Sequence, residues 1–206
     1  MDPAIDLLIK NTVSSYSKML GRFRPCRPGS EFLEQNLITL LSHEFLMLNP
    51  DGLAYSEIPF ITPNGNGQWG SRLDAYLAND SEGLLVEAKG SQSKDELFQR
   101  IEHDLERIKS RELKDSFMIM AMTPKEDRNY EIPNKESRNY TIPNKITGLI
   151  IADCWFSSHA EQWDMNGSLA TRFPLIAEIS TKSYEVGVYG GYSYFVLVGQ
   201  TDAMWL

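Results

Sequence analysis

The chain has 206 residues and a formal net charge of −8, and 42% of its residues are hydrophobic. This length and composition allow one full hydrophobic core, so we expect a single domain over 1–206. The absence of a long apolar run, of a secretory signal and of a disulfide framework argues against a membrane partner and a secreted protein, and favours the cytoplasm.

Two helices and a strand are predicted at the start of the chain. Apolar residues at helical spacing predict a helix over 3–20. Residues 21–29 contain two prolines and three arginines and predict a loop. Ser30 can cap a second helix that ends at Leu48, before an Asn-Pro-Asp-Gly turn. The residues over 54–61 predict a strand.

The stretch over 71–89 predicts a β-hairpin. Two alternating apolar runs flank Asn-Asp-Ser-Glu at 79–82, which is typical of a four-residue hairpin loop. Symmetrical pairing around this loop places Leu77 opposite Leu84. This pairing fixes the partner of every other residue in the hairpin. Residues two apart then share a face of the sheet, because successive side chains alternate between the two faces of a strand.

The same pairing places Asp74 opposite Glu87, with Lys89 on the same face. Directly opposed like charges repel, so this patch needs an explanation, and a divalent cation is the simplest one. Mg²⁺ prefers oxygen ligands, so we expect Asp74, Glu87 and the Ala88 carbonyl to hold it, with Mn²⁺ able to substitute. A cation there would polarise a phosphodiester and activate a water molecule. Lys89 could orient that water or stabilise developing charge.

These residues resemble the core motif of the PD-(D/E)xK nuclease superfamily. Asp74 matches the acidic residue of the second core strand, and 87–89 matches Asp/Glu-x-Lys on the third, whereas Leu73 stands where the family name has proline. The resemblance spans about 32–123. It implies an α/β, restriction-endonuclease-like αβββαβ core (about 31–156) with a mixed central sheet flanked by helices, plus an N-terminal helix and a C-terminal β-hairpin. The implied activity is Mg²⁺-dependent hydrolysis of nucleic acid. DNA is the expected substrate, although no sequence feature decides between DNA and RNA.

Later segments fit that order of elements. Ser93 and Glu96 form a capping-box pattern before a helix whose apolar stripe reaches Ile108. Apolar runs at 117–122 and 147–156 predict buried strands. The residues over 184–194, with Gly-Gly at the centre, predict a hairpin that closes the sheet.

The resemblance also implies two further polar residues near the metal. The first is a glutamate on the first core helix, for which Glu31, Glu34 and Glu44 are candidates. We choose Glu34, because Glu31 stands at the helix start, where a carboxylate favours the dipole, and Glu44 lies near the end. The second is a polar residue on the helix after the hairpin, for which Gln99 is chosen. His103, four residues later, is interpreted as an ordinary surface or core histidine.

The acidic charge leaves alternatives open. Nucleic-acid affinity depends on Lys and Arg that neutralise phosphates, so a net charge of −8 suggests modest affinity, a homodimer or a partner protein. One alternative is a catalytically inactive binding or assembly module with the same fold. Another is a hydrolase in which Asp74 and Glu87 form an acid/base pair, which leaves Lys89 without a task. A tandem repeat, at 128–135 and 138–145, is interpreted as a surface loop, with a substrate-contacting flap as the alternative.

Overall fold

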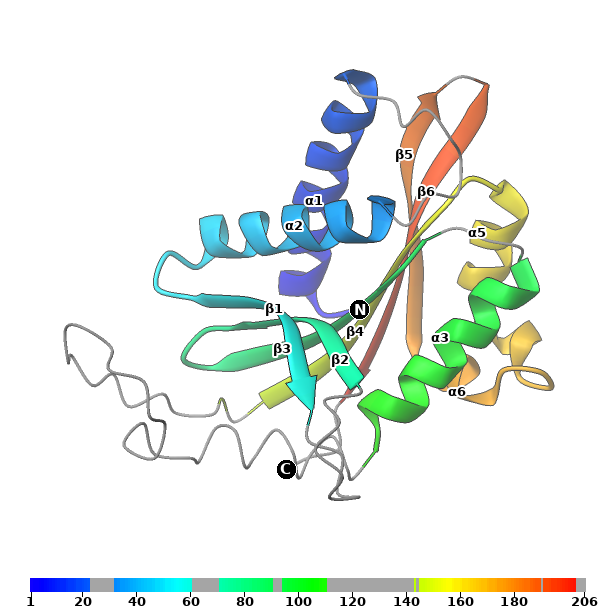
Figure 1. The fold of residues 1–206 in the computed structure, drawn as a ribbon. Helices are drawn as coiled ribbons and strands as arrows, with labels where there is room; N and C mark the ends of the chain where they lie inside the picture. The colour runs from blue at the N-terminus through cyan, green and yellow to red at the C-terminus, as the bar shows by residue number, and fades with distance from the viewer. Residues whose placement is uncertain are drawn as a thin grey trace.

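The predicted hairpin lies inside a six-stranded mixed sheet (Figure 1). The computed structural model describes residues 1–22, 32–60, 71–90, 94–110, 143, 145–189 and 191–202. The strands are β1 (Leu53–Phe60), β2 (Ser71–Ala78), β3 (Glu82–Lys89), β4 (Lys145–Cys154), β5 (Ser180–Tyr189) and β6 (Tyr192–Asp202). Their order across the sheet is β1-β2-β3-β4-β6-β5. The β3–β4 pair is parallel and the other four pairs are antiparallel.

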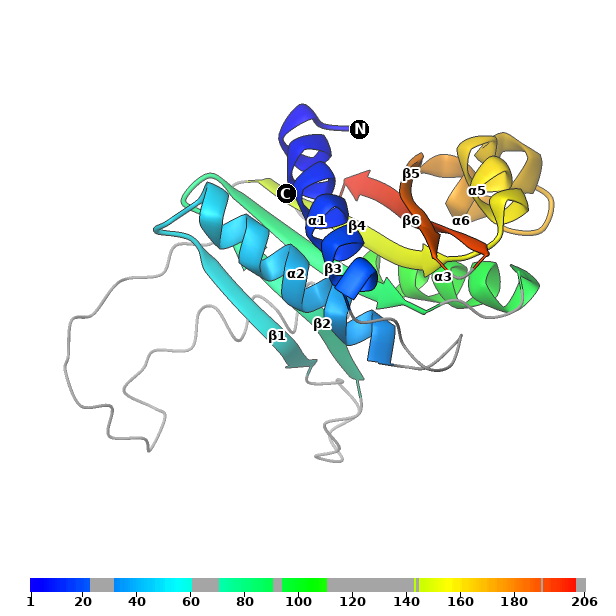
Figure 2. The ribbon, with the colours of Figure 1, turned by 90° about the horizontal axis from the view of Figure 1, so that it is seen from above.

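Helices cover both faces of this sheet (Figure 2). They are α1 (Pro3–Arg22), α2 (Phe32–Leu48), α3 (Lys94–Ile108), α5 (Ser157–Asp164) and α6 (Pro174–Glu178), with a 3₁₀ turn η2 (Asn166–Leu169). The helices α1 and α2 lie on one face, and α3, α5 and α6 on the other. The predicted α/β class, with a mixed sheet flanked by helices, is confirmed. No helix in the described ranges is long and apolar enough to cross a membrane.

The central strands are buried on both faces because each face carries its own core. On β3, Val86 and Ala88 pack with residues of α1 and α2, whereas Leu85 packs against α3. Phe98 of α3 stacks against Trp163 of α5 at 6.0 Å between ring centroids. This two-sided burial explains why β3 and β4 are nearly continuous apolar runs.

Most elements predicted from the sequence are confirmed, with ends shifted by one or two residues, except that the hairpin predicted over 184–194 extends over 180–202. The hairpin register is confirmed, since Leu77 pairs with Leu84. The predicted strand at 117–122, the caps at Ser30 and Ser93 and most of the tandem repeat lie outside the described residues.

Two short helices, α5 and α6, were not predicted, because distant side chains stabilise them. At the end of α5 the Thr181 hydroxyl donates a hydrogen bond to the Trp163 carbonyl at 2.7 Å, and α6 has two such contacts. The carboxylate of Glu102 on α3 accepts hydrogen bonds from the backbone N–H groups of Leu175 and Ile176, at 2.8 and 3.0 Å. The Asn166 side chain donates to the Ile179 carbonyl at 2.8 Å. A five-residue helix has little stability of its own, so its sequence carries little signal.

The contact between α3 and β4 yields a test of the fold. A Cβ at Gly148 would lie 2.6 Å from Cγ2 of Ile108 and 2.7 Å from Cγ2 of Thr201, both on stiff β-branched side chains. We expect Gly148→Ala to lower the free energy of unfolding by about 1–3 kcal/mol through overpacking, as measured by urea denaturation. Gly167→Ala is the control, because a Cβ there meets nothing within 4 Å. Equal stability of the two variants would contradict this packing.

Candidate active site

The strand β2 separates from β3 at Asp74. The β2–β3 ladder ends with Ala75 opposite Val86. The predicted pairing of Asp74 with Glu87 is therefore wrong. Instead, Oδ2 of Asp74 accepts a hydrogen bond from the backbone N–H of Ala88 at 2.6 Å. A buried N–H needs an acceptor, and a side chain here replaces the missing strand. The carboxylate of Asp74 is thereby fixed on the open edge of β3.

Glu34 on α2 is held in the same way one step further along. Its carboxylate accepts a hydrogen bond from the backbone N–H of Gly90. Residues 88 and 90 are two positions apart on an extended chain, so their N–H groups point to the same edge. Glycine at position 90 permits the approach, since a Cβ would lie 3.3 Å from Cγ of Glu34. The predicted helper Glu34 and Asp74 therefore occupy one edge, with side chains 26% and 36% exposed.

Four charged side chains beneath this edge alternate in sign around a closed ring. Nζ of Lys89 lies 2.7 Å from Oδ2 of Asp104 on α3 and 3.6 Å from Oε2 of Glu87. Arg107, also on α3, contacts the Glu87 carboxylate and lies 3.2 Å from Oδ1 of Asp104. We call these four residues the ionic ring. Asp74 borders it, with its Oδ2 4.0 Å from Nζ of Lys89.

The ionic ring shifts the protonation equilibria of its members. Burial raises the pKa of Glu87 to about 8, and the charges of Asp104 and Asp74 add to this, while Arg107 and Lys89 oppose it. Burial would lower the pKa of Lys89, but the Asp104, Glu87 and Asp74 carboxylates outweigh it, so this pKa lies above its ordinary value. Lys89 is therefore a charged hydrogen-bond donor near neutral pH.

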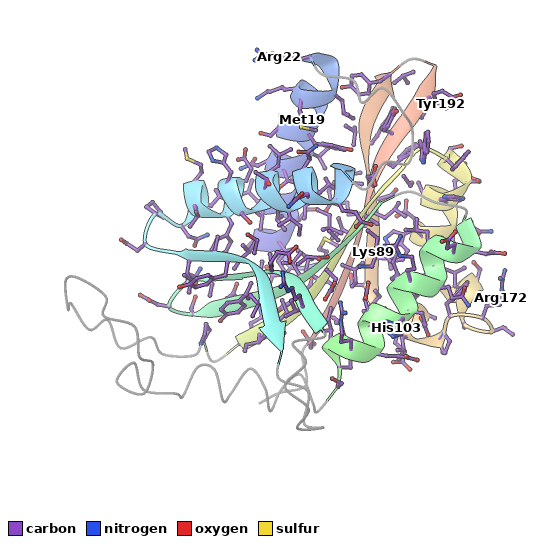
Figure 3. All side chains as sticks on the ribbon, viewed as in Figure 1. Met19, Arg22, Lys89, His103, Arg172 and Tyr192 are labelled. Atoms are coloured by element: carbon purple, nitrogen blue, oxygen red, sulfur yellow. The ribbon has the colours of Figure 1, made fainter. Side chains whose placement is uncertain are left out.

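An open cleft of about 330 Å³ lies between the end of β3 and α3. Its lining residues are Lys89, Gln99, Arg100, His103 and Asp104. Gln99, which the resemblance implies near the metal, therefore lines the same cleft as Lys89. His103 is exposed and lies on α3, as Figure 3 shows. It lines the same cleft as Lys89.

The other candidates lie elsewhere. Glu44 accepts a hydrogen bond from the Ser15 hydroxyl at 2.7 Å, so it faces α1 instead of the cleft. Glu31 lies outside the described residues. Arg72, two residues before Asp74 on β2, lies 2.8 Å from Glu57.

Sequence reasoning missed Asp104 and Arg107. Both lie on α3 within the segment that carries the buried Ile101, Leu105 and Ile108. The sequence signal for this cluster was Asp104, an acidic residue directly before the buried Leu105. A carboxylate on the apolar face of a helix is buried and therefore requires a charged partner.

The oxygens along the open edge are of the type that Mg²⁺ prefers. The partly exposed carboxylate of Asp74 fits a hard cation directly, whereas Oε1 of Glu34 also lies 3.3 Å from Arg100. The Ala88 carbonyl accepts from Nζ of Lys89 at 2.9 Å, and Glu87 is held by Arg107, so these two oxygens fit only if their cations move. Within the described part of the chain, no group of three or more His, Cys, Asp or Glu side chains is already arranged around a metal position.

Comparisons with models of protein families, with curated proteins and with solved structures found no match. A function for this site must therefore be argued from its residues and their geometry.

The raised pKa of Glu87 predicts a dependence of stability on pH. A carboxyl group whose folded pKa exceeds its unfolded value holds a proton more tightly when folded, so stability falls as the pH rises from 4.5 toward 8. We expect Glu87→Gln to be more stable than the wild type at pH 8.5, by at least about 1 kcal/mol, and to lose this advantage near pH 5. Thermal unfolding across this range measures the difference. The exposed Glu185→Gln is the control, and a pH-independent difference for Glu87→Gln would contradict the expectation.

Proposed function

We propose that the chain is a Mg²⁺-dependent nuclease with a restriction-endonuclease-like core over about 31–156, acting in the cytoplasm. The observation that carries this proposal is the gathering of Asp74, Glu87 and Lys89 where β2 leaves β3, beside an open cleft. Paired acidic oxygens next to a fixed ammonium suit phosphodiester hydrolysis, in which negative charge builds on the phosphate.

The order of elements supports the finer fold. The described elements α2, β1, β2, β3, α3 and β4 follow one another as helix, three strands, helix and strand. The resemblance implies this order. Asp74 lies on β2, Glu87 and Lys89 lie on β3, and Glu34 and Gln99 lie on α2 and α3, which are the elements on which the resemblance expects them.

In this proposal each residue has a defined task. Asp74 and Glu34 would hold Mg²⁺, with the Ala88 carbonyl joining them once Lys89 moves and Glu87 once Arg107 moves. A Mg²⁺ ion supplies Lewis-acid polarisation and lowers the pKa of a bound water. Lys89 donates a hydrogen bond from Nζ to a phosphate oxygen or to the attacking water. Because its pKa is raised, it acts as a donor and not as a base.

The substrate of this proposal is nucleic acid, with DNA expected. Net charge is −8, yet the cleft itself carries the cationic side chains of Lys89 and Arg100 beside His103. These groups supply local phosphate contacts on an otherwise acidic surface. Gln99 can add a hydrogen bond from the cleft wall. A homodimer or a partner protein would extend the contact area.

A second candidate function is an inactive nuclease-fold module that binds or assembles without cleavage. The ionic ring favours it, since Glu87 is only 1% exposed and is held by Arg107. With all four groups ionised the ring is neutral and needs no further cation. In this case the charges of the ring would contribute to the structure alone.

Incubation with circular DNA, linear DNA and RNA in the presence of Mn²⁺ distinguishes the two. We expect cleavage by the wild type and a loss of at least about 100-fold in rate for Lys89→Ala, because a preorganised donor is removed. Asp74→Ala should lose both cleavage and Mn²⁺ binding.

Lys10→Ala is the matched control for Lys89→Ala, since Lys10 is an exposed lysine of α1. Binding of nucleic acid by a folded wild type that cleaves none of these substrates would favour the inactive module. Full activity of Lys89→Ala would exclude the proposed task of Lys89.

A further inference from the structure

Arg107 contacts the buried carboxylate of Glu87, which is one of the proposed ligands of the metal. Its guanidinium contacts Oε1 of Glu87 from the last turn of α3. Glu87 is 1% exposed, so solvent does not compete for this contact, whereas the Arg107 side chain is 25% exposed. The arginine therefore reaches Glu87 from the side that is open to solvent.

Arg107 has a second partner that would hold it away from Glu87. Oδ1 of Asp104 lies 3.2 Å from its guanidinium, one helical turn away on α3, while Oδ2 of Asp104 is engaged by Lys89. An arginine that left Glu87 would keep one ion pair and would extend into solvent. Its departure would therefore not leave a buried charge without a partner, which is the costly outcome for an ion pair of this kind.

We propose that Arg107 and a divalent cation compete for Glu87, so that Arg107 sets the affinity of the site for metal. This inference rests on the proposed function, since it assumes that the open edge of β3 binds a cation. A metal at about 2.1 Å from a carboxylate oxygen replaces a hydrogen-bond donor at that oxygen, and its charge repels a neighbouring guanidinium. Binding of the cation to Glu87 would therefore require the release of Arg107.

The test is isothermal titration of Mn²⁺ into the full chain without nucleic acid. We expect Arg107→Gln to bind Mn²⁺ at least about tenfold more tightly than the wild type, a change of the size that second-shell groups produce. The gain should disappear in the double variant Arg107→Gln/Glu87→Gln, because Glu87 is the group for which the two cations compete.

Arg172→Gln is the matched control. It removes the same charge from an arginine whose partner, Asp95, is exposed, and Figure 3 shows Arg172 well apart from Lys89. Its affinity for Mn²⁺ should stay within about twofold of the wild type, since exposed charges at this separation are screened. Should Arg107→Gln fail to fold by circular dichroism, Arg107→Lys keeps the charge but loses the planar fork, and it should also bind Mn²⁺ more tightly than the wild type.

Each result decides the question. Unchanged or weaker binding by a folded Arg107 variant overturns the inference, as does a gain that persists without Glu87. If the wild type binds Mn²⁺ and cleaves nucleic acid but Arg107→Gln shows no gain, the inference fails and the proposed function stands. If no variant binds Mn²⁺, both fail.

Discussion

The backbone N–H of Ala88 requires an acceptor, and the way in which it finds one shapes the candidate site. Because β2 separates from β3 at Asp74, a carboxylate takes the place of a strand carbonyl. Glu34 repeats this arrangement at Gly90. Two acidic groups are thus held by the main chain itself, which is stiffer than any side-chain support. This fixes their position on one edge, where Arg100 also lies 3.3 Å from Glu34 and Lys89 lies 4.0 Å from Asp74.

The charged groups fall into two layers with different solvent access. Asp74 and Glu34 form an outer layer that reaches water, while the ionic ring forms an inner layer beneath α3. In the inner layer each charge has two opposite neighbours, which offsets the loss of hydration. The inner layer holds Lys89 charged, and the outer layer supplies carboxylate oxygens that are partly exposed to solvent. The chemistry proposed for the site depends on both layers.

The hairpin and its charged residues were predictable because their signals are local. The alternation of apolar residues and the loop at 79–82 determine the register, and Glu87 and Lys89 follow from it. The ionic contacts of Asp104 and Arg107 were not predictable, because they depend on how α3 crosses β3, although the acidic residue beside Leu105 is a local sign of a buried charge. The divergence at Asp74 was missed for a related reason: a hairpin pattern says which residues can pair, but not where pairing stops. The helix α6 likewise depends on side chains outside it, those of Glu102 and Asn166.

The parallel contact of β3 with β4 has a consequence for the order of folding. The β1–β2–β3 meander and the β5–β6 hairpin each join neighbouring segments, whereas β3 meets β4 only after the chain from Lys89 to Lys145 has closed a long loop. Loop closure of this kind slows folding, so this seam is expected to form late. At the start of β4, Lys145 lies 3.0 Å from both Asp2 and Glu82. These ion pairs join β4 to the N-terminus and to the start of β3. Asp74 and the four residues of the ionic ring all lie within residues 74–107, so they come together without such a closure, whereas Glu34 reaches Gly90 across 56 residues.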